Sequence, residues 1–398
     1  MPTSRAAPRA LTHVRVITPE TEIADGFVLL AEGRILHAGA GPPPADARTR
    51  DLRGFTVAPG FIDLHVHGGG GFSLTEGDPE QIRGYSRWAA ANGVTGFLVT
   101  LLPDERGRLV EHVESAAKGC EGEIGGARPL GINLEGPFLS PLRCGALDPN
   151  VLRPADVAEL REYLLAARGR LRIIAIAPEL PGAADVIAEA VGGGIAVALG
   201  HSDATYEEAQ RAFALGVSHV THCFNAMRPF HQRDPGCLVA ALNAPGVLVE
   251  LIADGVHVHP AAMEMLLRLK GVEKTVLVTD AIPVAGVGNG EFELQGARVE
   301  VKDGIARRAD GTLVGSAMPL DSMVRNAVAC LPVTPAEAIR MATLNPASVI
   351  GMADRKGRIA PGYDADLVVL SPELRVEMTF VAGELVYERQ PSALTRST

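Results

Sequence analysis

Hydrophobic residues recur through the middle of the chain in short runs of strand length, separated by stretches with helical spacing. Stretches 78–93 and 205–216 open on Asp78 and Thr205 and close on a glycine, as helices do. Buried parallel strands read as nearly continuous apolar, β-branched runs. Eight such runs span residues 61–67, 95–102, 130–136, 171–179, 195–202, 219–226, 247–254 and 275–281. The pattern predicts an α/β fold, a (β/α)8 TIM-type barrel with eight alternations over roughly 220 residues.

A doubly wound open sheet is the alternative arrangement of alternating strands and helices. It needs a GxGxxG fingerprint directly after its first strand. The glycine-rich stretch 68–72 follows His-x-His instead and does not fit that fingerprint. We therefore favour the barrel.

The two ends of the chain differ from the middle. Residues 10–57 and the segment after residue 357 alternate short β-rich pieces with Gly and Pro turns. This predicts a small β-sandwich domain built from both termini, residues 1–57 plus 358–398, with the barrel at 58–357.

The composition and net charge of the chain argue against nucleic acids and membranes as binding partners. Of 398 residues 47% are hydrophobic, and 37 Lys and Arg against 47 Asp and Glu give a net charge of −10. Such an acidic chain is a poor nucleic-acid or membrane-surface binder, and its apolar runs fall short of the ~20 residues that span a bilayer. Five scattered cysteines without CxxC favour reduced thiols, and no apolar run of the signal-peptide kind follows the first arginines. We expect a cytoplasmic protein.

Residues that can bind metal or move a proton stand at the ends of the apolar runs. In a barrel these ends converge on one mouth. Burying such groups without a cation would cost several kcal/mol each, so a divalent metal is expected. Imidazole and carboxylate without thiolate suit Zn²⁺, with Fe²⁺, Co²⁺ or Mn²⁺ as alternatives. The candidates are His65, His67, Glu135, His201, His222 and Asp280.

Two spacings refine this metal-site prediction. His65 and His67 are two apart on a strand, so both imidazoles point to one face and can reach one ion. No lysine occurs between Lys118 and Lys270, so a carboxylated lysine cannot bridge two ions at the third to sixth strands. Glu135 is then the natural central carboxylate.

Several longer stretches carry a resemblance to a known family. They are APGFIDLHVHGGGG (58–71), LEGPF (134–138), LGHSDAT (199–205), THCFNAMRPFHQRDPG (221–236), DGVHV (254–258), VTDAIP (278–283), LVGSAMPLD (313–321) and PGYDADLVVL (361–370). With them the chain resembles the amidohydrolase superfamily and, within it, the N-acetylglucosamine-6-phosphate deacetylases. The resemblance implies metal-dependent hydrolysis of the N-acetyl amide of N-acetylglucosamine 6-phosphate, giving glucosamine 6-phosphate and acetate.

The resemblance also implies roles for individual residues. The main metal ligands would be Glu135, His201 and His222, with water completing the shell. His65 and His67, together with Asp280, could hold a second ion, so one or two ions per subunit are expected. Asp280 would in addition be the general base.

Substrate contacts follow from the same resemblance. Asn225, the backbone of Ala226, His257 and Ala146 would hold the amino sugar phosphate. Arg233 would reach the phosphate bound in the neighbouring subunit, which implies a homodimer.

One residue departs from the family pattern. A histidine that helps to polarise the amide carbonyl is usual shortly after LEGPF, whereas this chain has Leu147 there. Losing such a donor typically costs about 10²–10³ in rate. Either the metal alone polarises the carbonyl, another residue substitutes, or the substrate differs. Two alternatives therefore remain, a deacetylase for another amino sugar phosphate such as the N-acetylgalactosamine isomer, and a non-catalytic amidohydrolase-like binding protein.

Overall fold

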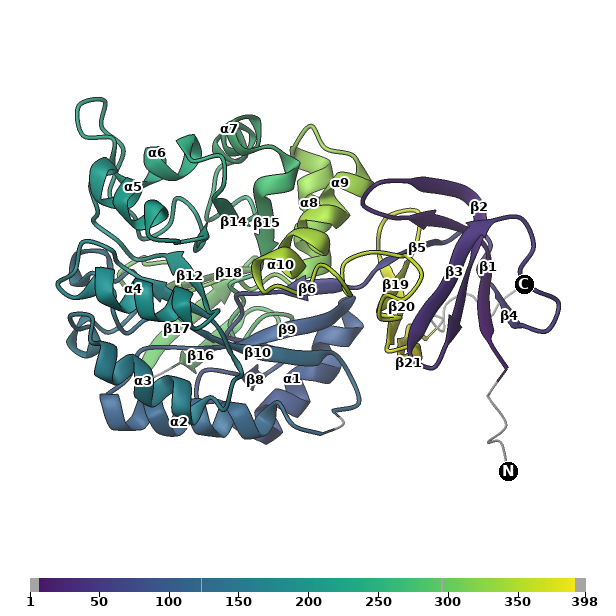
Figure 1. Cartoon of the computed structure of the whole chain (residues 1–398), viewed down its shortest axis with the longest axis horizontal. Coiled ribbons are helices and arrows are strands. Elements are labelled where there is room, and N and C mark those ends of the chain that lie inside the picture. Colours follow the sequence, from purple (N-terminus) through teal and green to yellow (C-terminus); the bar gives the residue numbers. More distant parts are fainter. Residues whose placement is uncertain (1–6, 123, 295, 391–398) are drawn as a thin grey trace.

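The computed structural model describes residues 7–122, 124–294 and 296–390. It has two parts, a barrel surrounded by helices and a sheet at one end that combines both ends of the chain (Figure 1). The outermost residues of the predicted terminal domain, 1–6 and 391–398, lie outside this description. The expectation that the chain has no signal peptide rests mostly on residues 1–6, which are outside the described part of the chain.

Eight parallel strands form the barrel, and each coincides with or lies mostly within one of the eight predicted apolar runs. The first and last strands approach each other where Val66 pairs with Ala281, and Asp280 N–H donates to His65 O at 2.9 Å. The predicted TIM-type barrel is thereby confirmed. The strands are β6 (Phe61–Asp63), β9 (Val94–Leu101), β10 (Arg128–Leu134), β11 (Leu171–Ile176), β12 (Ala196–Leu199), β13 (His219–Val220), β14 (Leu248–Ile252) and β15 (Thr275–Val278).

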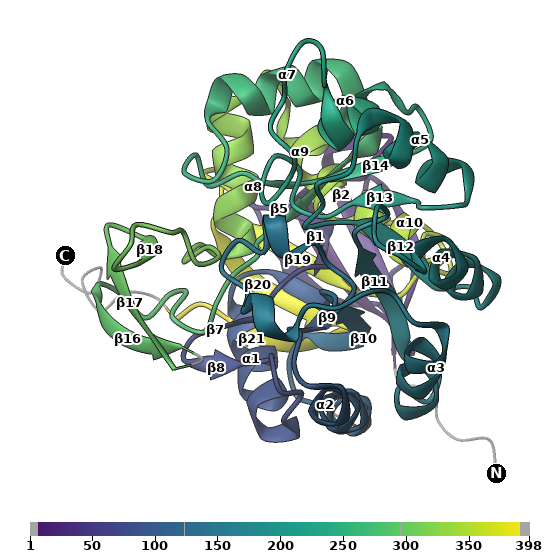
Figure 2. The same ribbon diagram turned by 90° about the vertical axis from the view of Figure 1, so that its left-hand side faces the viewer.

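Helices alternate with the strands and surround the barrel (Figure 2). Both predicted helix starts are capped: Asp78 accepts from the N–H groups of Glu80 and Gln81, and Thr205 forms a capping box with Glu208. The helices are α1 (Pro79–Ala91), α2 (Arg106–Gly119), α3 (Val157–Ala166), α4 (Ala183–Gly192), α5 (Tyr206–Ala214), α6 (Gly236–Asn243), α7 (Pro260–Lys270), α8 (Leu320–Cys330), α9 (Pro335–Met341) and α10 (Leu344–Val349), with 3₁₀ turns Pro141–Arg143, Pro149–Val151 and Val272–Lys274.

The two ends of the chain form one mixed sheet of eight strands, as the small β domain predicted from both termini requires. The antiparallel pairing of β5 with β19 joins the N-terminal and C-terminal strands. The strands are β1 (Arg9–Ile17), β2 (Glu22–Ala31), β3 (Arg34–Ala40), β4 (Arg48–Asp51), β5 (Thr56–Pro59), β19 (Leu367–Leu370), β20 (Val376–Val381) and β21 (Glu384–Glu388).

Two smaller sheets lie beside the barrel and were not predicted. β7 (Gly68–Gly69) and β8 (Phe72–Ser73) form a short hairpin, and β16 (Gly290–Leu294), β17 (Ala297–Lys302) and β18 (Ile305–Arg308) form a three-stranded antiparallel sheet. The latter projects from one side of the barrel in Figure 2. Its side chains Val299 and Val301 share a hydrophobic cluster with Ile282 and Val284, which follow the last barrel strand.

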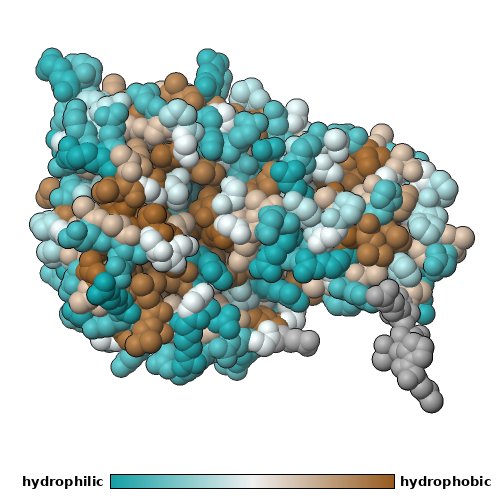
Figure 3. Space-filling view, viewed as in Figure 1, coloured by the Kyte–Doolittle hydropathy of each residue, from teal (hydrophilic) through white to brown (hydrophobic). Residues whose placement is uncertain are grey.

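Burial of apolar side chains holds each part together. One large cluster fills the barrel and the layer between strands and helices, and a second fills the terminal sheet. On the face drawn in Figure 3, hydrophobic patches alternate with hydrophilic residues over the barrel part. Among the described helices, none has the length and apolar character needed to cross a membrane.

Candidate metal centre and substrate cavity

The candidate ligands lie where the barrel strands end and the backbone turns sharply. His201, His222 and Asp280 all have positive φ values, 45°, 25° and 48°. Non-glycine residues rarely adopt this conformation, and it concentrates at functional sites. These turns bring side chains from distant strands to the mouth of the barrel, as the sequence predicted.

Three predicted ligands meet at one point. Oε1 of Glu135 lies 3.0 Å from Nε2 of His201 and 3.1 Å from Nε2 of His222, and the two nitrogens are 3.1 Å apart. All three side chains are buried. Tetrahedral ligands about 2.0–2.1 Å from Zn²⁺ would be spaced by roughly 3.3 Å. The triangle therefore has the dimensions of a metal-ligand set.

The other three candidates adjoin this triangle. Nε2 of His67 lies 3.2 Å from Oε2 of Glu135 and 3.2 Å from Oδ1 of Asp280. Nε2 of His65 lies 3.2 Å from Nε2 of His67 and 3.4 Å from Oε1 of Glu135. Glu135 thus stands between both groups, and His65, His67 and Asp280 form a second set of donor atoms close enough to hold an ion.

The donor chemistry fits a divalent cation. Nδ1 of His201 lies 2.9 Å from the carbonyl oxygen of Arg143. An N–H at Nδ1 that donates to this carbonyl leaves the lone pair at Nε2, which then points to Glu135 and His222. Several buried lone pairs that face one another need a shared positive charge.

Electrostatics in the site follow from the dense packing of charges. Burial alone would raise the pKa of Glu135, but positive charge on His65 and the close contacts of its carboxylate with His201 and His222 hold that pKa well below its usual range. Burial alone would lower the pKa of His67, but Asp280 and Glu135 raise it to about 9. Burial likewise opposes ionisation of Asp280, yet the hydrogen bond from His67 and nearby imidazole charge lower its pKa. These shifts favour ionised carboxylates.

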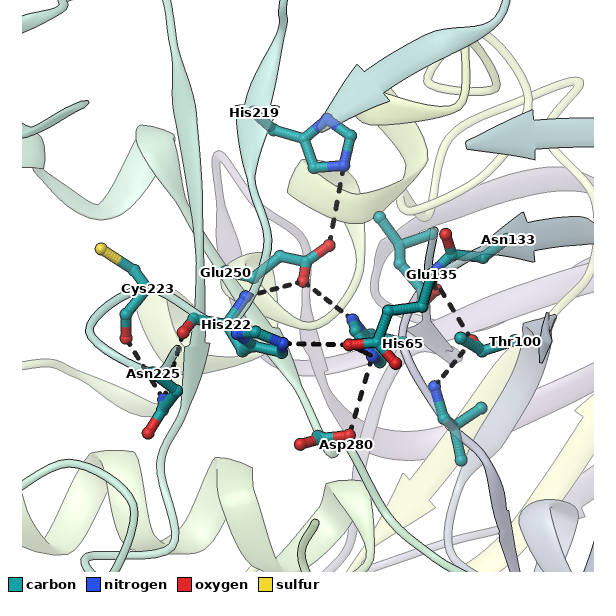
Figure 4. A network of polar contacts seen from close by, with 12 residues as sticks. His65, Thr100, Asn133, Glu135, His219, His222, Cys223, Asn225, Glu250 and Asp280 are labelled. Atoms are coloured by element: carbon teal, nitrogen blue, oxygen red, sulfur yellow. Dashed lines mark hydrogen bonds and ion pairs between the residues drawn. The ribbon is translucent and has the colours of Figure 1, made fainter. Parts of the chain in front are cut away.

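Glu250, in the middle of β14, supports the ligands from behind and was missed by the sequence analysis. Its Oε2 lies 3.3 Å from Nδ1 of His65 and accepts the backbone N–H of His222 at 3.1 Å (Figure 4). On its other side, Oε1 lies 3.7 Å from Nε2 of the fully buried His219. An acidic residue in the interior of the apolar run VLVELIAD, rather than at its end like Asp254, was the signal that could have identified it.

A cavity of about 660 Å³ opens onto these ligands. Of the predicted substrate-binding residues, Ala146, Asn225, Ala226 and His257 all line it, and so does Leu147. Leu147 thus places an apolar side chain on the cavity wall. The cavity is therefore continuous from the metal-ligand set to the predicted sugar contacts.

His257 is held by a neighbouring carboxylate. Oδ2 of Asp254 lies 2.6 Å from Nδ1 of His257, and Oδ1 accepts the backbone N–H groups of Val256 and His257. Burial alone would lower the pKa of His257, but the hydrogen bond and charge of Asp254 raise it. An imidazolium on the cavity wall is suited to an anionic ligand.

Comparisons with known proteins agree with this geometry. The model of the amidohydrolase family matches residues 56–386. The chain is 39% identical over 360 residues to an N-acetylglucosamine-6-phosphate deacetylase of Homo sapiens, covering 86% of each chain. The chain belongs to the N-acetylglucosamine-6-phosphate deacetylase family of the amidohydrolase superfamily.

Two further relatives of this amidohydrolase are informative. An N-acetylgalactosamine-6-phosphate deacetylase of Escherichia coli O157:H7 is 36% identical over 379 residues, which are 94% of this chain and 99% of the relative. An N-acetyl-D-glucosamine-6-phosphate deacetylase of Mycobacterium smegmatis, solved as an Asp-to-Ala mutant in complex with N-acetyl-D-glucosamine-6-phosphate, superposes with a TM-score of 0.91 at 36% identity. That likeness covers 96% of this chain and 100% of the solved one.

Arg233 is the predicted substrate-binding residue that does not line the cavity. It lies exposed on the loop between β13 and α6, and its side chain has no hydrogen bond or ion pair with the described residues. The same loop exposes 61% of Phe230, and the loop after β10 exposes 74% of Leu142. Asp203 joins the two loops, because it pairs with Arg228 on one and with Arg143 on the other.

Proposed function

We propose that this chain is a metal-dependent deacetylase that hydrolyses N-acetylglucosamine 6-phosphate to glucosamine 6-phosphate and acetate. The observation that carries the proposal is the convergence of Glu135, His201 and His222 within 3.1 Å at the base of a cavity that Asp280 also lines. The strong likeness to deacetylases over nearly the whole chain supports the same reaction.

Glu135, His201 and His222 would hold the principal ion, and His65, His67 and Asp280 could hold a second. Imidazole nitrogen and carboxylate oxygen without thiolate favour zinc. A divalent cation in such a site lowers the pKa of a coordinated water and polarises a carbonyl oxygen.

Asp280 is the proposed proton carrier of the reaction. Its lowered pKa keeps the carboxylate ionised at neutral pH, so it can accept a proton from the attacking water. The oxygen of that water bonds to the acyl carbon, and the C–N bond then breaks. Asp280 returns the proton to the departing amine, so that the products are acetate and the free amino sugar phosphate.

The remaining cavity residues bind the sugar. Asn225, the backbone of Ala226, Ala146 and His257 line the wall beside the ligand set, and the raised pKa of His257 favours binding of a phosphate.

A homodimer would bring Arg233 to the neighbouring cavity. The exposed apolar side chains of Phe230 and Leu142, on two loops linked through Asp203, give this part of the surface an area that a second subunit can cover. The five cysteines are free, which supports a reducing compartment, the cytoplasm.

N-Acetylgalactosamine 6-phosphate is the alternative substrate. The Escherichia coli relative favours it, and so does Leu147, because this leucine cannot donate the hydrogen bond that the usual histidine gives. A binding protein without activity is disfavoured, since Glu135, His201, His222 and Asp280 are all present. The assignment is tested by kinetics on the two epimers with the same metal-loaded preparation. A higher kcat/KM for N-acetylglucosamine 6-phosphate supports it. A higher kcat/KM for N-acetylgalactosamine 6-phosphate would make the galacto epimer the substrate instead.

A further inference from the structure

Arg308 is the only lysine or arginine among the described residues that line the cavity. It ends β18, the last strand of the three-stranded sheet, and its backbone N–H donates to Thr312 O at 2.9 Å in the turn that follows. The segment after this turn runs directly to the catalytic site, because Ser316 N–H donates to Asp280 O at 2.8 Å. The position of Arg308 is thus fixed relative to Asp280 by backbone hydrogen bonds.

The guanidinium of Arg308 donates one hydrogen bond to the residues that the structure describes. Nη2 donates to the carbonyl oxygen of Ala146 at 2.7 Å, next to Leu147. Among the described residues its buried Nε–H has no hydrogen-bond partner, and its guanidinium forms no salt bridge. The charge of Arg308 also acts on Asp310 at longer range. The carboxylate of Asp310 is exposed, however, and accepts the backbone N–H of Thr312.

A half-buried cation without a counter-ion is unfavourable unless a ligand supplies the negative charge. A guanidinium has five N–H donors and is well suited to phosphate. Apart from the candidate metal ligands, the other titratable side chains that the structure describes on the cavity wall are His257 and the carboxylates of Glu76 and Glu293. These two carboxylates would repel an anion. An anionic substrate therefore needs Arg308 more than a neutral one does.

We propose that Arg308 binds the phosphate of the amino sugar phosphate from within the same subunit, while its bond to Ala146 O holds the loop of Leu147 against the cavity. This inference rests on the proposed function. It gives the phosphate a cation that does not depend on Arg233 of a neighbouring subunit.

The test compares Arg308→Gln with Arg308→Lys and, as a matched control, Arg298→Gln. Glutamine removes the charge and is too short to reach Ala146 O, whereas lysine keeps the charge without the planar fork. Arg298 lies on β17 of the same sheet, with its exposed side chain paired to Glu291. Binding of glucosamine 6-phosphate, glucosamine and inorganic phosphate to the metal-loaded protein is measured by calorimetry, with KM for N-acetylglucosamine 6-phosphate alongside.

We expect Arg308→Gln to lower the binding affinity for glucosamine 6-phosphate and for inorganic phosphate by about 10- to 100-fold, the range for hydrogen bonds to charged groups. The affinity for glucosamine should stay unchanged. For the phosphorylated ligands, the affinity of Arg308→Lys should lie between those of Arg308→Gln and the wild type, and Arg298→Gln should match the wild type. Equal weakening of glucosamine and glucosamine 6-phosphate, or no weakening of either, would overturn the proposal. Failure of the proposed function is a separate result, because it would appear as absent turnover by the wild-type protein.

Discussion

The carboxylate of Glu250 lies 3.3 Å from Nδ1 of His65, while Nε2 of the same imidazole lies 3.4 Å from Glu135. His65 is therefore held between a carboxylate behind the site and a carboxylate within it. Burial would raise the pKa of Glu250, but hydrogen bonding and charge from His65 outweigh it, so Glu250 is ionised. Its contact to the backbone of His222 gives one buried side chain a hold on two candidate ligands.

Glu250→Gln should lower metal affinity by about 10- to 100-fold, the usual cost of removing a group that orients a metal-bound histidine. The amide keeps the volume, and its carbonyl oxygen can take the place of Oε2, but it lacks the negative charge that strengthens the hydrogen bonds from His65 and His222. Metal content after equilibration in buffers of defined free Zn²⁺ measures the change. Glu111→Gln, on the exposed face of α2, is the control, and equal affinities in both variants would remove Glu250 from this role.

Asp280→Asn should reduce kcat by about 10²–10⁴, because an amide cannot accept the proton of the attacking water. Metal bound by Glu135, His201 and His222 should be largely retained. Single-turnover kinetics, with metal content measured on the same sample, separate the two effects. A variant that holds metal and keeps wild-type turnover would exclude Asp280 as the base.

Arg233→Ala should raise KM for the phosphorylated substrate far more than for the unphosphorylated one, since the arginine is expected to contact the phosphate across a dimer interface. A mixed dimer tests this directly. Pairing an Arg233→Ala subunit with an Asp280→Asn subunit leaves one cavity with both residues, so each mixed dimer should have about half of the activity of a wild-type dimer. No recovery on mixing would place Arg233 outside the neighbouring site.

KM for the phosphorylated substrate should rise as the pH rises through the raised pKa of His257. Below that pKa the imidazolium attracts the phosphate, and above it the attraction is lost. Asp254→Asn removes the carboxylate that raises this pKa, so the increase in KM should begin at a lower pH. Profiles of KM from about pH 6 to about 9 compare the two proteins. Superimposable profiles would show that the charge of His257 does not affect substrate binding.

The barrel and its candidate ligands could be predicted because both depend on local patterns. Each apolar run is one strand, and the fold requires parallel strands to end at the same mouth. Residues as distant as His67 and Asp280 could therefore be placed together from strand order alone, and they lie 3.2 Å apart.

What escaped prediction depends on how segments fold back over the barrel. Residues 297–302 alternate buried and exposed positions, as an antiparallel strand does. That local pattern does not say that the sheet lies beside the mouth or that Arg308 lines the cavity. Glu250 was missed for another reason, since it sits within a strand rather than at its end, where the ligands were sought.

Metal-dependent acetate release tests the central claim most directly. N-Acetylglucosamine 6-phosphate is supplied to Zn²⁺-loaded protein and to protein stripped by a chelator, and acetate is measured over time. We predict turnover by the loaded protein, its loss on stripping, and its return when Zn²⁺ is restored. Equal acetate release by stripped protein, or none by protein with confirmed bound metal, would contradict the account.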